Sequence, residues 1–512
     1  MKDYDEATRF LGQWGRFQQI VFFLLCASIF PNGFGAFSLV FLTDIPDHRC
    51  TVPEVNLTQD WHKAIIPIKV VNGNQELSRC SRYRLDVVGN LSALGLVPGR
   101  DVNLTDLEQE ACVDGWSYGR DIYQSTVVSE FDLVCVDQWK QPFTSTIYFL
   151  GVLVGSFFSG QLSDRFGRKP IFFATMAIQT LFTFAAIFSP SWTVFCILLF
   201  ISGLGQISNY VSAFVLGTEI LTGHVRVLFS SMGVSLAFAF GYMMLPLFAY
   251  FLRDCRSLLL ALSLPGLLYL PLWWFIPESP RWLLSQGKYQ EAEAILREAA
   301  KRNKLQAPHL IFDDHNIDAD KTQMQPKERL IVFNLLKSGN IRSTTLILCM
   351  VWFTLSTGYF GLSLNTSRLH ANPYISCFIS AAVEVCQNSI ALEMLGKFGL
   401  TTGTALMFAY TAELYPTVLR NTATGTCTTV SRVGSCIAPF LLQLSMFFKY
   451  LPYITLGTLA VASAFATLFL PESFGRPLPQ TIQQMHRRES VTFPCIKRKE
   501  RSKAVVLFES QL

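Results

Sequence analysis

Charged side chains are scarce in this chain. Asp, Glu, Lys and Arg together make up 15% of the 512 residues, and 50% of the residues are hydrophobic. Ordinary soluble domains carry about 25% charged residues, so the composition argues against a protein built from soluble domains. The net charge of +5 is spread over loops rather than gathered on one face, and we therefore predict no nucleic-acid partner.

Motifs that would mark an enzyme or an ATP-driven protein are also missing. The segment from Gly217 to His224 comes nearest to a phosphate-binding loop, but its second glycine is one position late and no lysine follows. No metal-binding cluster or nucleophile elbow is present, so we predict no catalysis, no metal site and no ATP use. A cleavable signal peptide is not evident, because residues 1–17 are polar and no small-residue cleavage site follows the first apolar run.

The sequence does contain apolar runs of about 18 to 25 residues, the length needed to cross a bilayer as a helix. Only helices and closed barrels satisfy their backbone inside lipid, and these runs are too long for barrel strands. We therefore predict an all-α membrane protein. Residues 1–276 should form a six-span bundle, with spans at Gln18–Leu42, Pro142–Leu162, Ile171–Phe188, Trp192–Val211, Leu228–Leu252 and Ser257–Ile276.

Residues 43–141 form a hydrophilic insert between the first two spans. The insert holds four cysteines and three Asn-x-Ser/Thr sequons. This combination is typical of an oxidising exterior, so we expect a glycosylated extracellular domain with two disulfides in any of three pairings. The alternative is a cytosolic domain with free thiols. The residues concerned are Cys50, Cys80, Cys112 and Cys135 for the disulfides, and Asn56, Asn90 and Asn103 for glycosylation.

Two distant stretches of the chain match each other. Glu219 opens Glu-Ile-Leu-Thr-Gly-His-Val-Arg, and Glu413 opens Glu-Leu-Tyr-Pro-Thr-Val-Leu-Arg. A Pro-Glu-Ser turn follows each glutamate after 58 positions, at Pro277 and Pro471. Two membrane blocks of equal spacing indicate an internal duplication, which many transporters use to build a site between their halves.

The basic loop from Gly160 to Lys169 marks the cytoplasmic side, because Arg and Lys favour cytoplasmic loops. With the insert outside, both termini are expected in the cytoplasm. Residues 277–343 should be a cytoplasmic linker with a helix at Tyr289–Arg302, residues 344–481 a C-terminal bundle, and residues 482–512 a basic cytoplasmic tail. The ending Ser510-Gln511-Leu512 suits a PDZ domain, which adds a free carboxy-terminal segment as a strand.

Several further motifs stand in a fixed order along the chain. With the two Glu-to-Arg segments and the two Pro-Glu-Ser turns, they are Asp3-Tyr4-Asp5, Pro31-Asn32-Gly33, Asp164-Arg165-Phe166-Gly167-Arg168-Lys169, the segment from Gly203 to Tyr210, and Ser431-Arg432-Val433-Gly434-Ser435. This ordered set resembles the major facilitator superfamily, and within it the organic cation/carnitine transporter branch of the solute carrier 22 family. The resemblance implies two pseudo-symmetric bundles with 12 spans in all, a plasma-membrane location, alternating access, and sodium-coupled uptake of carnitine and related cations or zwitterions.

The second half is too short to be a complete copy of the first. It lacks roughly 30 to 40 residues before Glu413, enough for one helical hairpin, and the shortening lies near residues 386–393. One crossing between Pro373 and Thr411, as a long and broken helix, keeps both Glu-to-Arg segments on the same side. We therefore expect about ten spans. The alternative to a working transporter is a transport-inactive truncated isoform, retained in the cell or acting on a full-length relative.

A carnitine-like substrate joins a quaternary ammonium to a carboxylate. An ammonium that cannot donate hydrogen bonds is best held by aromatic faces, and a carboxylate by the paired donors of an arginine. Arg432 lies within the span Thr422–Phe448, where a buried charge is costly, so we expect it to bind the carboxylate. Pairing with Glu384 or with a carbonyl, for helix packing, is the alternative. The aromatic candidates are Tyr210, Trp352 and Tyr359, for which plain packing is the alternative.

Four intramembrane amides offer further polar groups. Asn32 and Asn209 are candidates for substrate binding, and Gln179 and Gln206 for a sodium or polar site, since amide oxygens can coordinate a cation. Hydrogen bonding between helices is the alternative for each of them. Apart from sodium as coupling ion, we expect no cofactor.

The charged residues at the cytoplasmic ends have a separate expected role. Ion pairs between the loop and the Glu-to-Arg segments should form a clamp that holds the outward-facing state and breaks as the halves rock. The clamp candidates are Asp164, Arg165, Arg168, Glu219, Arg226, Glu413 and Arg420.

Overall fold

The predicted spans of the first half fold as long helices in the computed structural model. These are α2 (Arg16–Ala36) with the short α3 (Leu39–Leu42), α7 (Lys140–Phe166), α8 (Arg168–Ala186), α9 (Trp192–Ile220), α11 (Val234–Phe251) and α12 (Cys255–Tyr269). The structure describes residues 8–53, 57–71, 74–308, 311, 339–365, 374, 377–378, 391–415, 417–446, 448 and 450–470.

Two spans differ from their predicted limits. α9 continues past Val211 to Ile220, so Glu219 lies in the last turn of a spanning helix rather than in a loop. The fifth span begins with α10 (Gly223–Leu228) and a π-helical segment (Phe229–Gly233) before α11. Such π segments widen a helix locally and often mark functional sites.

The second half contributes α17 (Gly339–Asn365), α19 (Ala391–Leu414), α20 (Thr417–Gln443) and α21 (Leu451–Thr467). Seven helices in the described part of the chain are long and apolar enough to cross a membrane, six from the first half and α17. α19 and α20 are long but more polar, and α21 is shorter. The expected shortening near residues 386–393 falls partly outside the described residues, and the count of about ten spans stays a prediction.

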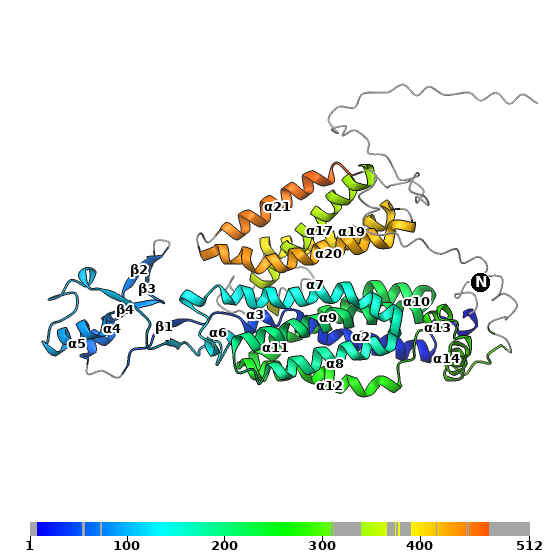
Figure 1. The fold of residues 1–512 in the computed structure, drawn as a ribbon, viewed down its shortest axis with the longest axis horizontal. Helices are drawn as coiled ribbons and strands as arrows, with labels where there is room; N and C mark the ends of the chain where they lie inside the picture. Colours follow the sequence, from blue (N-terminus) through cyan, green and yellow to red (C-terminus); the bar gives the residue numbers. More distant parts are fainter. Residues whose placement is uncertain are drawn as a thin grey trace, which may run out of the picture.

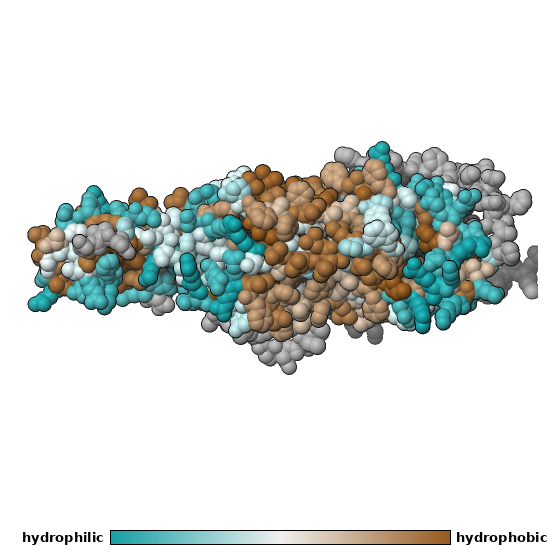
Figure 2. Space-filling view, turned by 90° about the horizontal axis from the view of Figure 1, so that it is seen from below, coloured by the Kyte–Doolittle hydropathy of each residue, from teal (hydrophilic) through white to brown (hydrophobic). Residues whose placement is uncertain are grey.

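The two halves lie side by side along one axis. α20 packs against α7, while the insert projects from one end of the bundle and α13 (Pro280–Ser285) and α14 (Tyr289–Arg302) cover the other end (Figure 1). α14 coincides with the helix predicted in the linker. Figure 2 shows an apolar band across the middle of the molecule and hydrophilic surface at both ends, which is the distribution that a bilayer imposes on a spanning bundle.

Glycines bring helix backbones of the first half into direct contact. A Cβ atom at Gly33 of α2 would lie 2.1 Å from the carbonyl oxygen of Phe238 in α11, and one at Gly151 of α7 would lie 2.1 Å from that of Phe200 in α9. No side chain fits in either place. Close backbone approach at small residues is how helices associate inside a membrane, where the hydrophobic effect no longer drives them together.

The insert contains short strands that the helical prediction did not include. Antiparallel pairs join β1 (His48–Cys50) to β6 (Trp116–Tyr118), β2 (Ile68–Val71) to β3 (Asn74–Leu77), and β4 (Ser81–Tyr83) to β5 (Gln109–Ala111). With α4 (Gln59–Ala64), α5 (Leu85–Ala93) and α6 (Val127–Glu130), they make a small mixed domain. Strands of three or four residues carry too little alternation for a sequence pattern to reveal them.

Candidate functional site

The amide candidates of the first half meet inside the bundle. The Asn32 amide donates to Oδ1 of Asn209 at 2.9 Å, and the Gln206 amide donates to the backbone oxygen of Asn32 at 2.7 Å. Tyr148 donates its hydroxyl proton to Oε1 of Gln206. These bonds join α2, α7 and α9, so interhelical hydrogen bonding, the alternative for these residues, is realised in the structure.

Two oxygens of this cluster keep free acceptor capacity. Asn32 Oδ1 and Gln179 Oε1 are buried and have no hydrogen-bond partner among the described residues. A Cβ atom at Gly35 would lie 4.0 Å from the amide nitrogens of both Gln179 and Gln206, an ordinary van der Waals contact, so Gly35 lies directly beside these amides. Buried oxygens without donors suit either a water molecule or a hard cation that takes oxygen ligands.

Arg432 lies where α20 meets the first half. Thr146 of α7 donates to the backbone oxygen of Cys436, one turn further along α20, at 2.9 Å. The Arg432 guanidinium lies close enough to Tyr210 of α9 to interact with it electrostatically, and the residue as a whole is half-buried. It forms no ion pair with any residue that the structure describes, and Glu384 lies outside those residues. The structure thus places a charged side chain between the two halves.

The three aromatic candidates occupy different surroundings. Tyr210 is half-buried and contacts Phe238 of α11. Trp352 is 3% exposed, donates to Thr411 at 3.2 Å and packs within the second half, which is the packing alternative for that residue. Tyr359 lies at the boundary between the halves, in ring contact with Phe37 of the first half at 5.9 Å.

A buried lysine that the sequence analysis missed lies beside Tyr359. Lys397 of α19 is only 2% exposed, and its ammonium lies over three aromatic rings, 4.7 Å from the centroid of Tyr242, 5.5 Å from Tyr359 and 5.7 Å from Phe37. Its Nζ is also 3.5 Å from the Tyr242 hydroxyl. The signal was a charged residue inside the apolar run Met394–Thr411, the same signal that singled out Arg432.

The predicted clamp forms from part of its expected residues. Arg168 donates two hydrogen bonds to Glu219, at 2.9 and 3.2 Å, and pairs with Asp164 at 2.6 Å. The Pro-Glu-Ser turn joins this clamp. Ser279 donates to Glu219 at 2.5 Å, and Glu278 accepts the backbone N–H groups of Arg168 and Lys169, each at 3.0 Å. The carboxylate of Glu278 thus caps the N-terminus of α8, where the helix dipole favours negative charge.

Two other clamp candidates, Arg165 and Arg226, have described contacts close to the ends of α7 and α9, and the remaining two lie outside the described side chains. The Arg165 guanidinium stacks over the ring of Phe166. Arg226 donates to the backbone oxygen of Leu221 at 2.9 Å, close to the end of α9. The side chains of Glu413 and Arg420 lie outside the described residues, so the clamp predicted for the second half stays a prediction.

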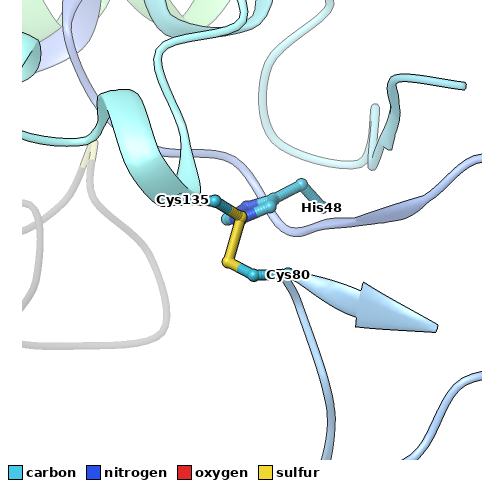
Figure 3. Close-up of side chains that lie close together, drawn as sticks. All are labelled: His48, Cys80 and Cys135. Carbon is cyan, nitrogen blue, oxygen red and sulfur yellow. A yellow bond between two sulfur atoms is a disulfide. The ribbon is translucent and has the colours of Figure 1, made fainter. Parts of the chain in front are cut away.

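The insert is joined by two disulfides, Cys50–Cys112 and Cys80–Cys135, which is one of the three possible pairings. Among the sequons, Asn90 and Asn103 are exposed, and Asn56 lies outside the described residues. His48 lies beside the Cys80–Cys135 disulfide (Figure 3). Sulfurs joined in a disulfide are not the thiolates that bind metal ions, so this trio is not a metal centre in the oxidised chain.

Comparison with known proteins places these features in a family. The family described as "Sugar (and other) transporter" matches residues 117–399. "Organic cation/carnitine transporter 2" of Rattus norvegicus is 50% identical over 532 residues, covering 96% of this chain and 95% of the relative. "Solute carrier family 22 member 4" of Mus musculus is 49% identical over 528 residues, covering 95% of each. The chain belongs to the organic cation/carnitine transporter branch of solute carrier family 22.

A solved structure shows the fold of this solute carrier 22 protein. The proton:xylose symporter XylE bound to 6-bromo-6-deoxy-D-glucose covers 90% of the chain and is itself covered over 98%, with a TM-score of 0.52 and 14% identity. The predicted major-facilitator fold is therefore confirmed, with seven candidate spans in the described part. This solute carrier 22 protein is a multi-pass membrane protein of a transporter family, not an enzyme.

The match to the rat relative shows a difference in length. The aligned region has 532 positions, whereas 96% of a 512-residue chain is about 490 residues, so about 40 aligned positions have no residue in this solute carrier 22 protein. These totals give the number of unmatched positions and not their place in the chain, so the missing hairpin before Glu413 stays a prediction.

Proposed function

We propose that this chain is a plasma-membrane secondary transporter of carnitine and related organic cations or zwitterions, working by alternating access with both termini in the cytoplasm. The observation that carries the proposal is Arg432, a charged residue between the halves without an ion-pair partner among the described residues. Arginine suits a carboxylate because its planar fork offers paired donors. The aromatic rings of Tyr242, Tyr359 and Phe37 supply the surface that a quaternary ammonium requires.

Uptake of radiolabelled carnitine into cells that express the chain tests this proposal. Because a charge-assisted pair is lost, Arg432→Ala should lower uptake about tenfold or more at equal surface abundance. Arg342→Ala is the matched control, since Arg342 is exposed at the start of α17 and lies outside the candidate site. Equal uptake by Arg432→Ala and the wild-type chain would refute the assignment.

We further propose sodium as the coupling ion, held by oxygens of the amide cluster. The buried, donor-free oxygens of Asn32 and Gln179 support this assignment, because sodium takes oxygen ligands. Replacing external sodium with N-methylglucamine should abolish carnitine uptake by the wild-type chain. Gln179→Leu should weaken the apparent affinity for sodium more than that for carnitine, and unchanged sodium dependence in this variant would count against the site.

A second candidate function follows from the absent hairpin. The roughly 40 positions that the rat relative has in excess support a transport-inactive isoform, retained in the cell or acting on a full-length relative. Surface biotinylation with glycan analysis separates the two candidates. Complex glycans on surface protein, attached at Asn90 or Asn103, favour the transporter, whereas purely immature glycans favour retention.

We propose Ser510–Leu512, outside the described residues, as the contact for a PDZ domain.

A further inference from the structure

The cage around Lys397 is formed by both halves of the molecule. Phe37, at the end of α2, and Tyr242 of α11 belong to the first half, whereas Tyr359 of α17 and Lys397 itself belong to the second. The rings of Phe37 and Tyr242 have centroids 4.3 Å apart, and both residues are fully buried. Three π faces and one hydroxyl surrounding a single ammonium are the arrangement by which proteins recognise organic cations.

We infer that Lys397 is a specificity-determining residue, whose ammonium occupies the aromatic cage as an in-chain cation and competes there with the cationic head of a substrate. The inference rests on the proposed function only in taking this cage as part of the substrate path. A tethered ammonium has a high effective concentration at the cage. A substrate cation therefore binds only in the fraction of molecules in which Lys397 has left, and its apparent affinity falls by that fraction.

This occupancy has a consequence for substrate choice. Competition from Lys397 weakens the binding of a zwitterion at the cage. Its carboxylate can offset this loss of binding free energy by pairing with the Arg432 guanidinium. A simple cation without a carboxylate has only the cage. Lys397 should therefore discriminate against simple quaternary ammonium ions more strongly than against carnitine.

Binding to the purified full chain tests the inference without requiring transport. The probe is choline, measured by the shift of the melting temperature in detergent, against 3,3-dimethylbutan-1-ol, its uncharged carbon analogue. Lys397→Ala should bind choline about tenfold more tightly than the wild-type chain and should not respond to the alcohol. Tyr242→Leu added to Lys397→Ala should abolish the gain, because it removes the ring closest to the ammonium.

Two further variants keep the test decisive. Lys140→Ala is the matched control, because Lys140 also lies over an aromatic ring, 5.4 Å from the centroid of Trp192, but at the start of α7 and outside the cage. This variant should bind choline as the wild-type chain does. If Lys397→Ala does not fold, Lys397→Met retains the apolar stem without the charge, with tetramethylammonium as a smaller probe. Equal cation binding by the wild-type chain and the Lys397 variants, or an equal response to the alcohol, would overturn the inference.

Carnitine uptake distinguishes this inference from the proposed function. Choline binding confined to Lys397 variants, together with no uptake by any variant, would uphold the cage and refute transport. Uptake that depends on Arg432, together with no gain in choline binding on removal of Lys397, would uphold transport and overturn the cage.

Discussion

Glu219 is the carboxylate at the centre of the clamp. It accepts two hydrogen bonds from Arg168 and one from Ser279, and the side chains of Glu219 and Arg168 are only 19% and 13% exposed. Glu219→Gln should destabilise the chain by about 1–3 kcal/mol, because the largely buried Arg168 guanidinium loses the more buried of its two carboxylate partners and keeps only the exposed Asp164. The melting temperature of the purified chain measures the loss.

The control for that measurement is Glu293→Gln. Glu293 pairs at 2.6 Å with Arg297, which lies one turn further along α14 on the side that faces solvent. Exposed pairs of this kind contribute about 0.3–0.5 kcal/mol, so the control should hardly change the melting temperature. Equal effects of both substitutions would show that Glu219 contributes no more than a surface ion pair.

Because of His48, the insert should lose stability as the pH falls. Burial, together with the nearby charge of Arg79, lowers the pKa of His48 below its ordinary 6.5. The unfolded chain therefore binds more protons than the folded chain between the two pKa values, so stability is lost as the pH falls below about 6.5 and is unaffected at higher pH. His48→Gln should reduce the drop in melting temperature between pH 7.5 and pH 5.5, whereas exposed His62→Gln should leave it unchanged.

At the scale of elements, the N-terminus of α8 depends on a residue more than 100 positions away. Glu278 accepts the N–H groups of Arg168 and Lys169, two donors that the helix leaves without internal partners. Glu278→Ala should cost about 0.5–2 kcal/mol, the usual effect of losing a cap. A melting temperature equal to that of the wild-type chain would show that water replaces the carboxylate without loss.

The sequence predicted elements well where hydrophobicity alone decides them. The apolar runs located all six spans of the first half, although α9 ends nine residues beyond its predicted limit, and the helical pattern at Tyr289–Arg302 located α14. It did not predict the strands of the insert, since pairs of three or four residues depend on contacts distant in sequence. It also treated the Pro-Glu-Ser turn as a repeat marker, although Glu278 and Ser279 belong to the clamp.

In the candidate site too, the sequence indicates single unusual residues but not the contacts that depend on how the helices associate. Arg432 was singled out because a charge within a predicted span is conspicuous, and its role in the site stays a prediction. Trp352 could not be separated from a packing residue, since its indole contacts depend on how α17, α19 and α20 associate. Lys397 carried the same signal as Arg432, but the aromatic rings around it come from three other helices, so their convergence appears only in the folded chain.

For the whole molecule, the expected shortening of the second half should limit both stability and the rate of uptake. A second half with fewer helices buries less surface against the first, so restoring the missing segment should raise both stability and uptake. We expect a chimera that carries the corresponding residues of the rat relative to show more surface protein and faster sodium-dependent carnitine uptake than the present chain. Equal surface amounts and equal rates would show that the shortened half is already sufficient.

The glycine contacts at Gly33 and Gly151 determine where the molecule can bend. With carbonyl groups of one helix lying directly against the backbone of its neighbour, α2 cannot slide along α11, nor α7 along α9, without collision. We therefore expect each of these two helix pairs to move as one rigid unit. Under the proposed alternating access, the halves would rotate about the contact between α20 and α7, and we expect a chemical crosslink there to arrest transport.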